Sequence, residues 1–156
     1  MLSRPARKIL VVSRFNHLAR LKGMDRNRQR LALAAVVVLH LIVTVGHGFA
    51  HGKAAVPLNW PSLVFVILVI QAGPLIGLAW MWRNPLQGAR LIGLTMAASL
   101  LFGLLNHFVI PSPDHVEHVV AMWRPLFETT AWLLVVTEAA GAILGLRYRS
   151  VTRRLA

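Results

Sequence analysis

The stretch at residues 31–50, LALAAVVVLHLIVTVGHGFA, contains no Lys, Arg, Asp or Glu and is long enough to cross a bilayer. A hydrocarbon core of about 30 Å needs roughly 20 predominantly apolar residues in a helix. Three further stretches of similar length and apolar composition follow at residues 63–82, 91–110 and 126–146. The sequence therefore predicts an all-α integral membrane protein in which residues 31–146 form a bundle of four transmembrane helices.

The segments that flank this bundle are basic. Residues 1–30 form a basic N-terminal segment and residues 147–156 a basic tail. Of the 17 Lys and Arg residues, only Lys53 and Arg124 lie outside these two segments and the loop between the second and third spans. Because Lys and Arg collect on the cytoplasmic side, both termini are expected in the cytoplasm, and a bacterial inner membrane is the expected location.

The net charge of +12 accordingly indicates membrane topology and contact with anionic lipid. A solvated nucleic-acid-binding module would be rich in charge, whereas this chain is 56% hydrophobic and only 14% charged, so no nucleic-acid partner is predicted. The sequence has no cysteine, which excludes thiol and disulfide chemistry. It also lacks a nucleophile motif, a phosphate-binding loop and a dinucleotide fingerprint, so no reaction is assigned from motifs.

The N-terminal segment allows three interpretations. Residues 4–22 carry several Arg and Lys and no acidic residue, which predicts a basic amphipathic helix on the surface of anionic lipid. A transit peptide has the same Arg-rich, acid-poor composition. A natural start at Met24 would leave the segment out altogether.

Small residues spaced four apart predict close packing between the helices. In the second, third and fourth spans these pairs are Gly73 and Gly77, Gly93 and Ala97, and Gly141 and Gly145. Packing within one bundle is the expected role, and a seam between copies in a homo-oligomer is the alternative. Pro74 is expected to kink the second span and to free a backbone carbonyl, which Gln71 or a hydroxyl would satisfy.

Histidines follow one face of the first span. His40, His47 and His51 are separated by seven and four residues, so at about 100° per residue they point within roughly 40° of one another. His107 closes the third span, His115 and His118 lie in the loop after it, and Glu128 lies in the first turn of the fourth span. Since the first and third spans run outward, all of these except His40 gather at the outer face of the membrane.

Neutral imidazole and carboxylate are the usual protein ligands of zinc, copper and iron. This convergence predicts a transition-metal site, with Asp114 or Glu117 orienting an imidazole from behind. The candidate ligands are His47, His51, His107, His115, His118 and Glu128. The same groups could instead form a polar network without metal, because outer-loop side chains are often simply solvated.

Two further alternatives stay open. His40 or His107 could bind a haem or pigment through one axial imidazole, as in an accessory or assembly subunit of a larger respiratory or photosynthetic membrane complex. His40 and Glu138, both near mid-bilayer, could form a proton relay or a buried hydrogen bond that fixes helix pairing. A transporter is the last choice, because four spans are few and no repeated pair of broken helices is present.

Overall fold

The computed structural model describes the backbone of residues 4–148 and the side chains of residues 27–148. Within that part all regular secondary structure is helical, and there are no strands. The elements in chain order are α1 (Arg4–Ala54), α2 (Trp60–Phe65), η1 (Val66–Ala72), α3 (Gly73–Trp80), α4 (Pro85–Leu104), η2 (Leu105–Val109) and α5 (Arg124–Leu146), where η denotes a π-helix. The prediction of an all-helical chain is confirmed.

Four of the helical segments in this described part are long and apolar enough to cross a membrane. They are Asn27–Ala54, Trp60–Trp80, Pro85–Val109 and Arg124–Leu146. Their outward faces carry exposed aliphatic side chains, such as Val45, Leu94 and Val136, each more than 60% exposed. Exposed apolar surface on this scale is expected where lipid, and not water, covers the protein.

The second and third spans begin where the sequence supplies a capping side chain. The Asn59 side chain accepts a hydrogen bond from the Ser62 backbone N–H at 2.9 Å, and Asn84 accepts one from Gln87 at 3.3 Å. A proline follows each cap and a third proline opens α5, as suits a first helical turn whose N–H groups have no helical partner. These caps fix the ends of the spans.

The first span ends one turn after its last histidine. Ala55 takes a left-handed backbone conformation (φ 52°), and the Val56 N–H then bonds back to the His51 carbonyl at 3.1 Å. This is the usual way in which a terminating residue satisfies the last carbonyls of a helix. The cap therefore closes α1 immediately beyond His51.

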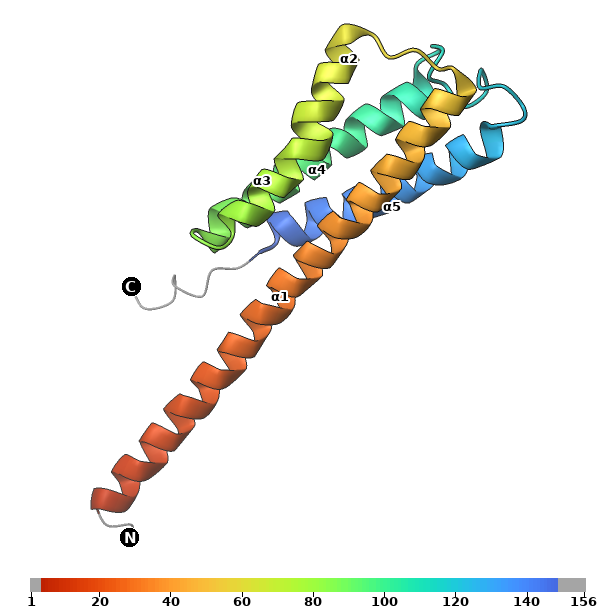
Figure 1. The fold of residues 1–156 in the computed structure, drawn as a ribbon. Coiled ribbons are helices and arrows are strands. Elements are labelled where there is room, and N and C mark those ends of the chain that lie inside the picture. The colour runs from red at the N-terminus through yellow and green to blue at the C-terminus, as the bar shows by residue number, and fades with distance from the viewer. Residues whose placement is uncertain (1–3, 149–156) are drawn as a thin grey trace.

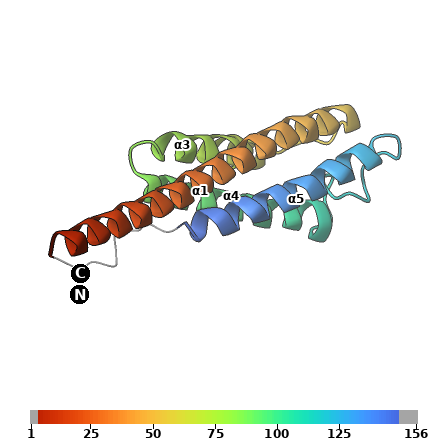
Figure 2. The ribbon, with the colours of Figure 1, turned by 90° about the horizontal axis from the view of Figure 1, so that it is seen from below.

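Each span packs against its neighbours in a four-membered ring. The α5 helix lies between α1 and α4, and α4 also packs against α3, as Figures 1 and 2 show from two directions. The contact of α1 with α3 closes the ring. The α1 helix extends far beyond the bundle at its N-terminal end (Figure 1), continuing the first span as one helix.

Glycine decides the closest of these contacts, as the spacing of small residues predicted. A Cβ at Gly145 would lie 2.6 Å from both the Ala89 oxygen and the Gly93 nitrogen of α4. Only a residue without a side chain allows backbones to approach so closely. The same contact region includes a buried apolar cluster, which is made of Leu33, Val37, Met81, Ala89, Ile92, Met96 and Tyr148.

The second span is π-helical just before Pro74 instead of simply kinked. Proline has no N–H, so the carbonyl four residues earlier, that of Ile70, lacks its usual helical partner. His40 fills that role, with its Nε2 3.1 Å from the Ile70 oxygen. The expectation that Gln71 or a hydroxyl would satisfy this carbonyl is wrong, because a histidine of the neighbouring span reaches it.

Candidate metal centre

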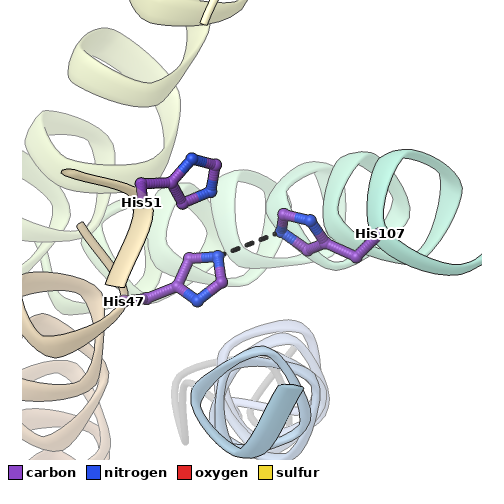
Figure 3. Close-up of side chains that lie close together, drawn as sticks. All are labelled: His47, His51 and His107. Carbon is purple, nitrogen blue, oxygen red and sulfur yellow. Dashed lines mark hydrogen bonds between the residues drawn. The ribbon is translucent and has the colours of Figure 1, made fainter. Parts of the chain in front are cut away.

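Three histidines from two spans meet toward the end of the bundle where α1 ends and α5 begins, which is called the outer end because the sequence predicts that it faces outward. His47 and His51 lie one turn apart on α1 and project toward His107, which η2 presents from the third span (Figure 3). One ring nitrogen from each of the three lies within 4.8 Å of the others, so the group could hold a metal ion. His47 and His107 are only 6% exposed, and His51 is partly buried.

The hydrogen bonds around His47 favour one of its two neutral tautomers. Thr130 on α5 donates its hydroxyl hydrogen to the Leu126 carbonyl at 2.8 Å, which leaves a lone pair on the Thr130 oxygen. When the hydroxyl hydrogen is directed to Leu126 in this way, the Thr130 oxygen accepts a hydrogen from Nδ1 of His47, which lies 2.8 Å away. The Nε2 atom of His47 in its neutral form therefore carries a lone pair.

The surroundings of His107 place its proton in the same way. Its Nδ1 lies 3.2 Å from the Asp114 backbone oxygen and 3.3 Å from the Asp114 carboxylate oxygen Oδ1, which are both acceptors. Nδ1 must carry the hydrogen, so Nε2 of neutral His107 also holds a lone pair. The Val116 N–H bonds to the His107 carbonyl at 3.0 Å and ties the outer loop to this residue.

The Nε2 atoms of His47 and His107 lie 3.2 Å apart (Figure 3), and when both rings carry their hydrogen on Nδ1, two lone pairs face each other across this distance. Without a cation between them, this arrangement is repulsive. A metal ion bound roughly 2.0–2.1 Å from each nitrogen would see them at an angle of about 100°, close to tetrahedral. The spacing thus fits two ligands of one ion.

His51 and Asp114 complete the surroundings of the site. Asp114 Oδ1 lies 3.2 Å from His51 Nε2, and the same oxygen faces His107. The other nitrogen of His51, Nδ1, is buried and has no hydrogen-bond partner among the described residues. A carboxylate behind two imidazoles is the common means of orienting metal-binding histidines, and Asp114 was one of the two residues predicted for it.

An aromatic ring closes one side of the group. Phe127 on α5 is fully buried, and its ring centre lies 4.8 Å from those of His47 and His51 and 5.3 Å from that of His107. It belongs to an apolar cluster with Ala50, Ala54 and Val119 that covers the outer end of the bundle.

The other predicted ligands lie outside this group. His115 and His118 approach each other, with ring centres 5.5 Å apart, but they occupy the turns of the outer loop, where His118 Nδ1 bonds to the Ser112 oxygen at 2.5 Å. Glu128 is exposed on α5. The structure thus brings together His47, His51 and His107 and leaves His115, His118 and Glu128 apart from them.

His40 lies deeper in the bundle and is fully buried. Because its Nε2 faces the Ile70 oxygen, Nε2 carries the hydrogen and Nδ1 holds the lone pair. Nδ1 has no hydrogen-bond partner in the described part, and the nearest acidic oxygen is that of Glu138 at 3.9 Å. The two residues thus lie close together, but the structure does not form the predicted buried hydrogen bond between them, because 3.9 Å is too long for one.

A cavity of about 150 Å³ extends from the three histidines to the deeper Glu138. At its outer end it is lined by His47, His51, His107 and Asp114, and at its inner end by Glu138. Sequence reasoning did not identify Thr130 or this cavity. Comparison with family models, curated proteins and solved structures found no match to the chain, so its function is argued from the site itself.

Proposed function

We propose that this chain is a membrane metalloprotein that binds one transition-metal ion through His47, His51 and His107. The observation that carries the proposal is the convergence of one ring nitrogen from each of the three histidines within 4.8 Å of one another, with the Nε2 atoms of His47 and His107 only 3.2 Å apart. The Thr130 hydroxyl and the Asp114 backbone oxygen, which lie 2.8 Å and 3.2 Å from the Nδ1 atoms of His47 and His107, support the tautomers that leave both Nε2 atoms free for a metal. A proton competes with the metal ion for these nitrogens, and its binding would convert the ring of His47 or His107 to imidazolium.

The chemistry of the donors narrows the choice of ion. Three imidazoles favour zinc, copper or iron over calcium or magnesium, which prefer oxygen ligands. Three protein ligands also leave a fourth position of a tetrahedral ion open, as in catalytic zinc sites. Because all three histidines line the cavity, the open position would face that space.

A porphyrin finds less support in this geometry. A cavity of about 150 Å³ is smaller than the roughly 300–1,000 Å³ of ordinary cofactor sites. The Nε2 atom of His40 is occupied by the Ile70 carbonyl, and that of His107 by His47. An ion fits the group as it stands, whereas a haem would require the helices to separate.

Metal analysis of protein purified in mild detergent tests the proposal. We expect about one zinc, copper or iron ion per chain in the wild type and a loss of nearly all of it in the His47→Ala/His107→Ala double variant. The matched control is His115→Ala/His118→Ala, which also removes two histidines but none of the three-histidine group. Equal, substoichiometric metal in all three proteins would contradict the proposal.

We further propose that the metal site lies on the outer side of a bacterial inner membrane, with both termini cytoplasmic. The distribution of Lys and Arg supports this orientation. Because the chain has no cysteine, single Glu117→Cys and Gln87→Cys variants, both at exposed positions, give an unambiguous labelling test. An impermeant thiol reagent added to intact cells should label only Glu117→Cys, and labelling of only Gln87→Cys would reverse the orientation.

A further inference from the structure

The cavity beneath the three histidines has the size of a small ring. Its volume of about 150 Å³ matches that of engineered protein cavities that bind benzene. Much of its wall is apolar, with contributions from Leu58, Val66, Ile70, Phe102, Leu134 and Val135. The three histidines lie at one end of the cavity and do not fill the rest of its volume.

The opening of the cavity lies between the first and second spans. The α1 helix packs against α3, and His40 reaches the Ile70 carbonyl of η1, but α2 and the rest of η1 make no comparable contact with α1 and lean away from it (Figure 1). Gly48 of α1 and Gln71 of η1 are both exposed, and both line the cavity. The cavity therefore reaches the surface between these two spans, on the side that lipid would cover.

Gln71 is an unusual residue for that position. It lies near the middle of the second span, where hydrocarbon offers an exposed amide no hydrogen bond. A polar side chain at such a depth commonly marks a pathway or a binding site. The segment that carries it is π-helical, and short π-helical segments are frequent at functional sites.

The inner end of the cavity offers a buried carboxyl group. Glu138 is 2% exposed, and His40 stands behind it with a lone pair on Nδ1. Gly103 separates this carboxyl from the metal site, because a Cβ there would lie 3.8 Å from the His107 ring and 3.9 Å from Glu138 Oε2. A molecule in the cavity would thus meet polar groups at both ends and apolar side chains between them.

From these features we infer that the cavity binds an uncharged, lipid-dissolved molecule with one six-membered ring and polar oxygen substituents, of the phenol or quinone type. It would enter between α1 and η1, with an oxygen toward the metal and the far side of the ring toward Glu138. No Lys or Arg lines the cavity, so an anion would have no charged partner there other than the proposed metal ion. The metal contact rests on the proposed function, whereas the cavity itself requires no ion.

Binding of 4-fluorophenol, followed by ¹⁹F NMR in detergent, tests the inference. The protein is titrated both metal-loaded and stripped of metal by a chelator. We expect saturable binding to both forms, tighter with metal, and at least tenfold weaker binding of fluorobenzene, which lacks the oxygen. No saturable binding of 4-fluorophenol, or equal binding of the two probes, would overturn the inference.

Two glycines one helical turn apart provide the matched variants. Gly48 lines the cavity and Gly52 does not, yet both are exposed and a Cβ at either would meet no atom within 4 Å. Gly48→Leu should therefore weaken 4-fluorophenol binding at least tenfold, and Gly52→Leu should leave it unchanged. Equal weakening in both variants, or in neither, would contradict access between α1 and η1.

The same samples separate this inference from the proposed metal centre. Metal content reports on the three histidines, and probe binding to the stripped protein reports on the cavity. A wild type without metal that still binds 4-fluorophenol would refute the metal centre alone. A metal-loaded wild type that binds no probe would refute the cavity inference alone.

Discussion

Replacing Thr130 by valine should weaken metal binding without removing any ligand. Valine has nearly the shape of threonine but lacks the oxygen that accepts the His47 Nδ1 hydrogen at 2.8 Å. The ring would lose its fixed orientation and tautomer. Loss of such a supporting hydrogen bond typically costs about 10–100-fold in metal affinity, which corresponds to about 1.4–2.8 kcal/mol.

Thr137 provides the matched control for this substitution. It lies two turns further along α5, is 5% exposed against 8% for Thr130, and donates to the Leu133 carbonyl at 2.9 Å as Thr130 does to that of Leu126. It makes no hydrogen bond to a described histidine. Thr137→Val therefore repeats the chemical change away from the metal centre.

Competition with a chelator of known affinity in detergent would measure the two dissociation constants for zinc. We expect the constant to rise about 10–100-fold in Thr130→Val and to stay within about twofold of wild type in Thr137→Val. Circular dichroism would verify that both variants remain helical. Equal affinities in the two variants would refute the role given to the hydroxyl of Thr130.

Three further outcomes follow from the structure. His40→Leu leaves the Ile70 carbonyl unpaired, so it should lower the free energy of unfolding by about 1–3 kcal/mol in denaturant titrations and leave zinc affinity unchanged. Unaltered stability would contradict the role of His40. Gly145→Leu should abolish the monodisperse folded peak in size-exclusion chromatography, because even a Cβ meets the Ala89 oxygen at 2.6 Å, whereas wild-type behaviour would disprove this close packing. Acidification to about pH 5 should release the bound ion and neutralisation should restore it, since imidazole binds metal only when unprotonated; retention of the ion in equilibrium dialysis would argue against histidine ligation.

The four spans could be predicted from the sequence because each is a continuous apolar stretch of membrane length. Their ends could not be read from hydropathy alone, since caps and prolines determine where the helices start. The third span (α4) begins at Pro85, several residues before the apolar stretch that starts at residue 91, because Asn84 caps it. The π-helical segments η1 and η2 were not anticipated; Pro74 gave the only signal for the first of them.

Convergence of His47, His51 and His107 also followed from the sequence. The i, i+4 spacing places two rings on one face, and the antiparallel order of the spans brings the outer end of the third helix to the same level. Which side chain of the fourth span faces the three histidines could not be predicted, because it depends on the rotation of α5 about its axis. Glu128 and Thr130 are two residues apart and so lie on nearly opposite faces of a helix.

A signal for that rotation was nevertheless present. The small residues Gly141 and Gly145 mark the face of α5 that packs against α4. At about 100° per residue, Leu134 and Thr130 lie within about 20° of Gly141 around the helix and are both buried, whereas Glu128 lies about 140° away and is exposed. Extending the packing face along the helix would have favoured Thr130 over Glu128.

X-ray absorption at the edge of the bound metal tests the central claim most directly. The account predicts about three imidazole nitrogens roughly 2.0–2.1 Å from the ion in the wild type, and one fewer in His107→Ala. A first shell made of oxygen alone, or an imidazole signal that is unchanged in His107→Ala, would contradict the assignment of the metal to His47, His51 and His107.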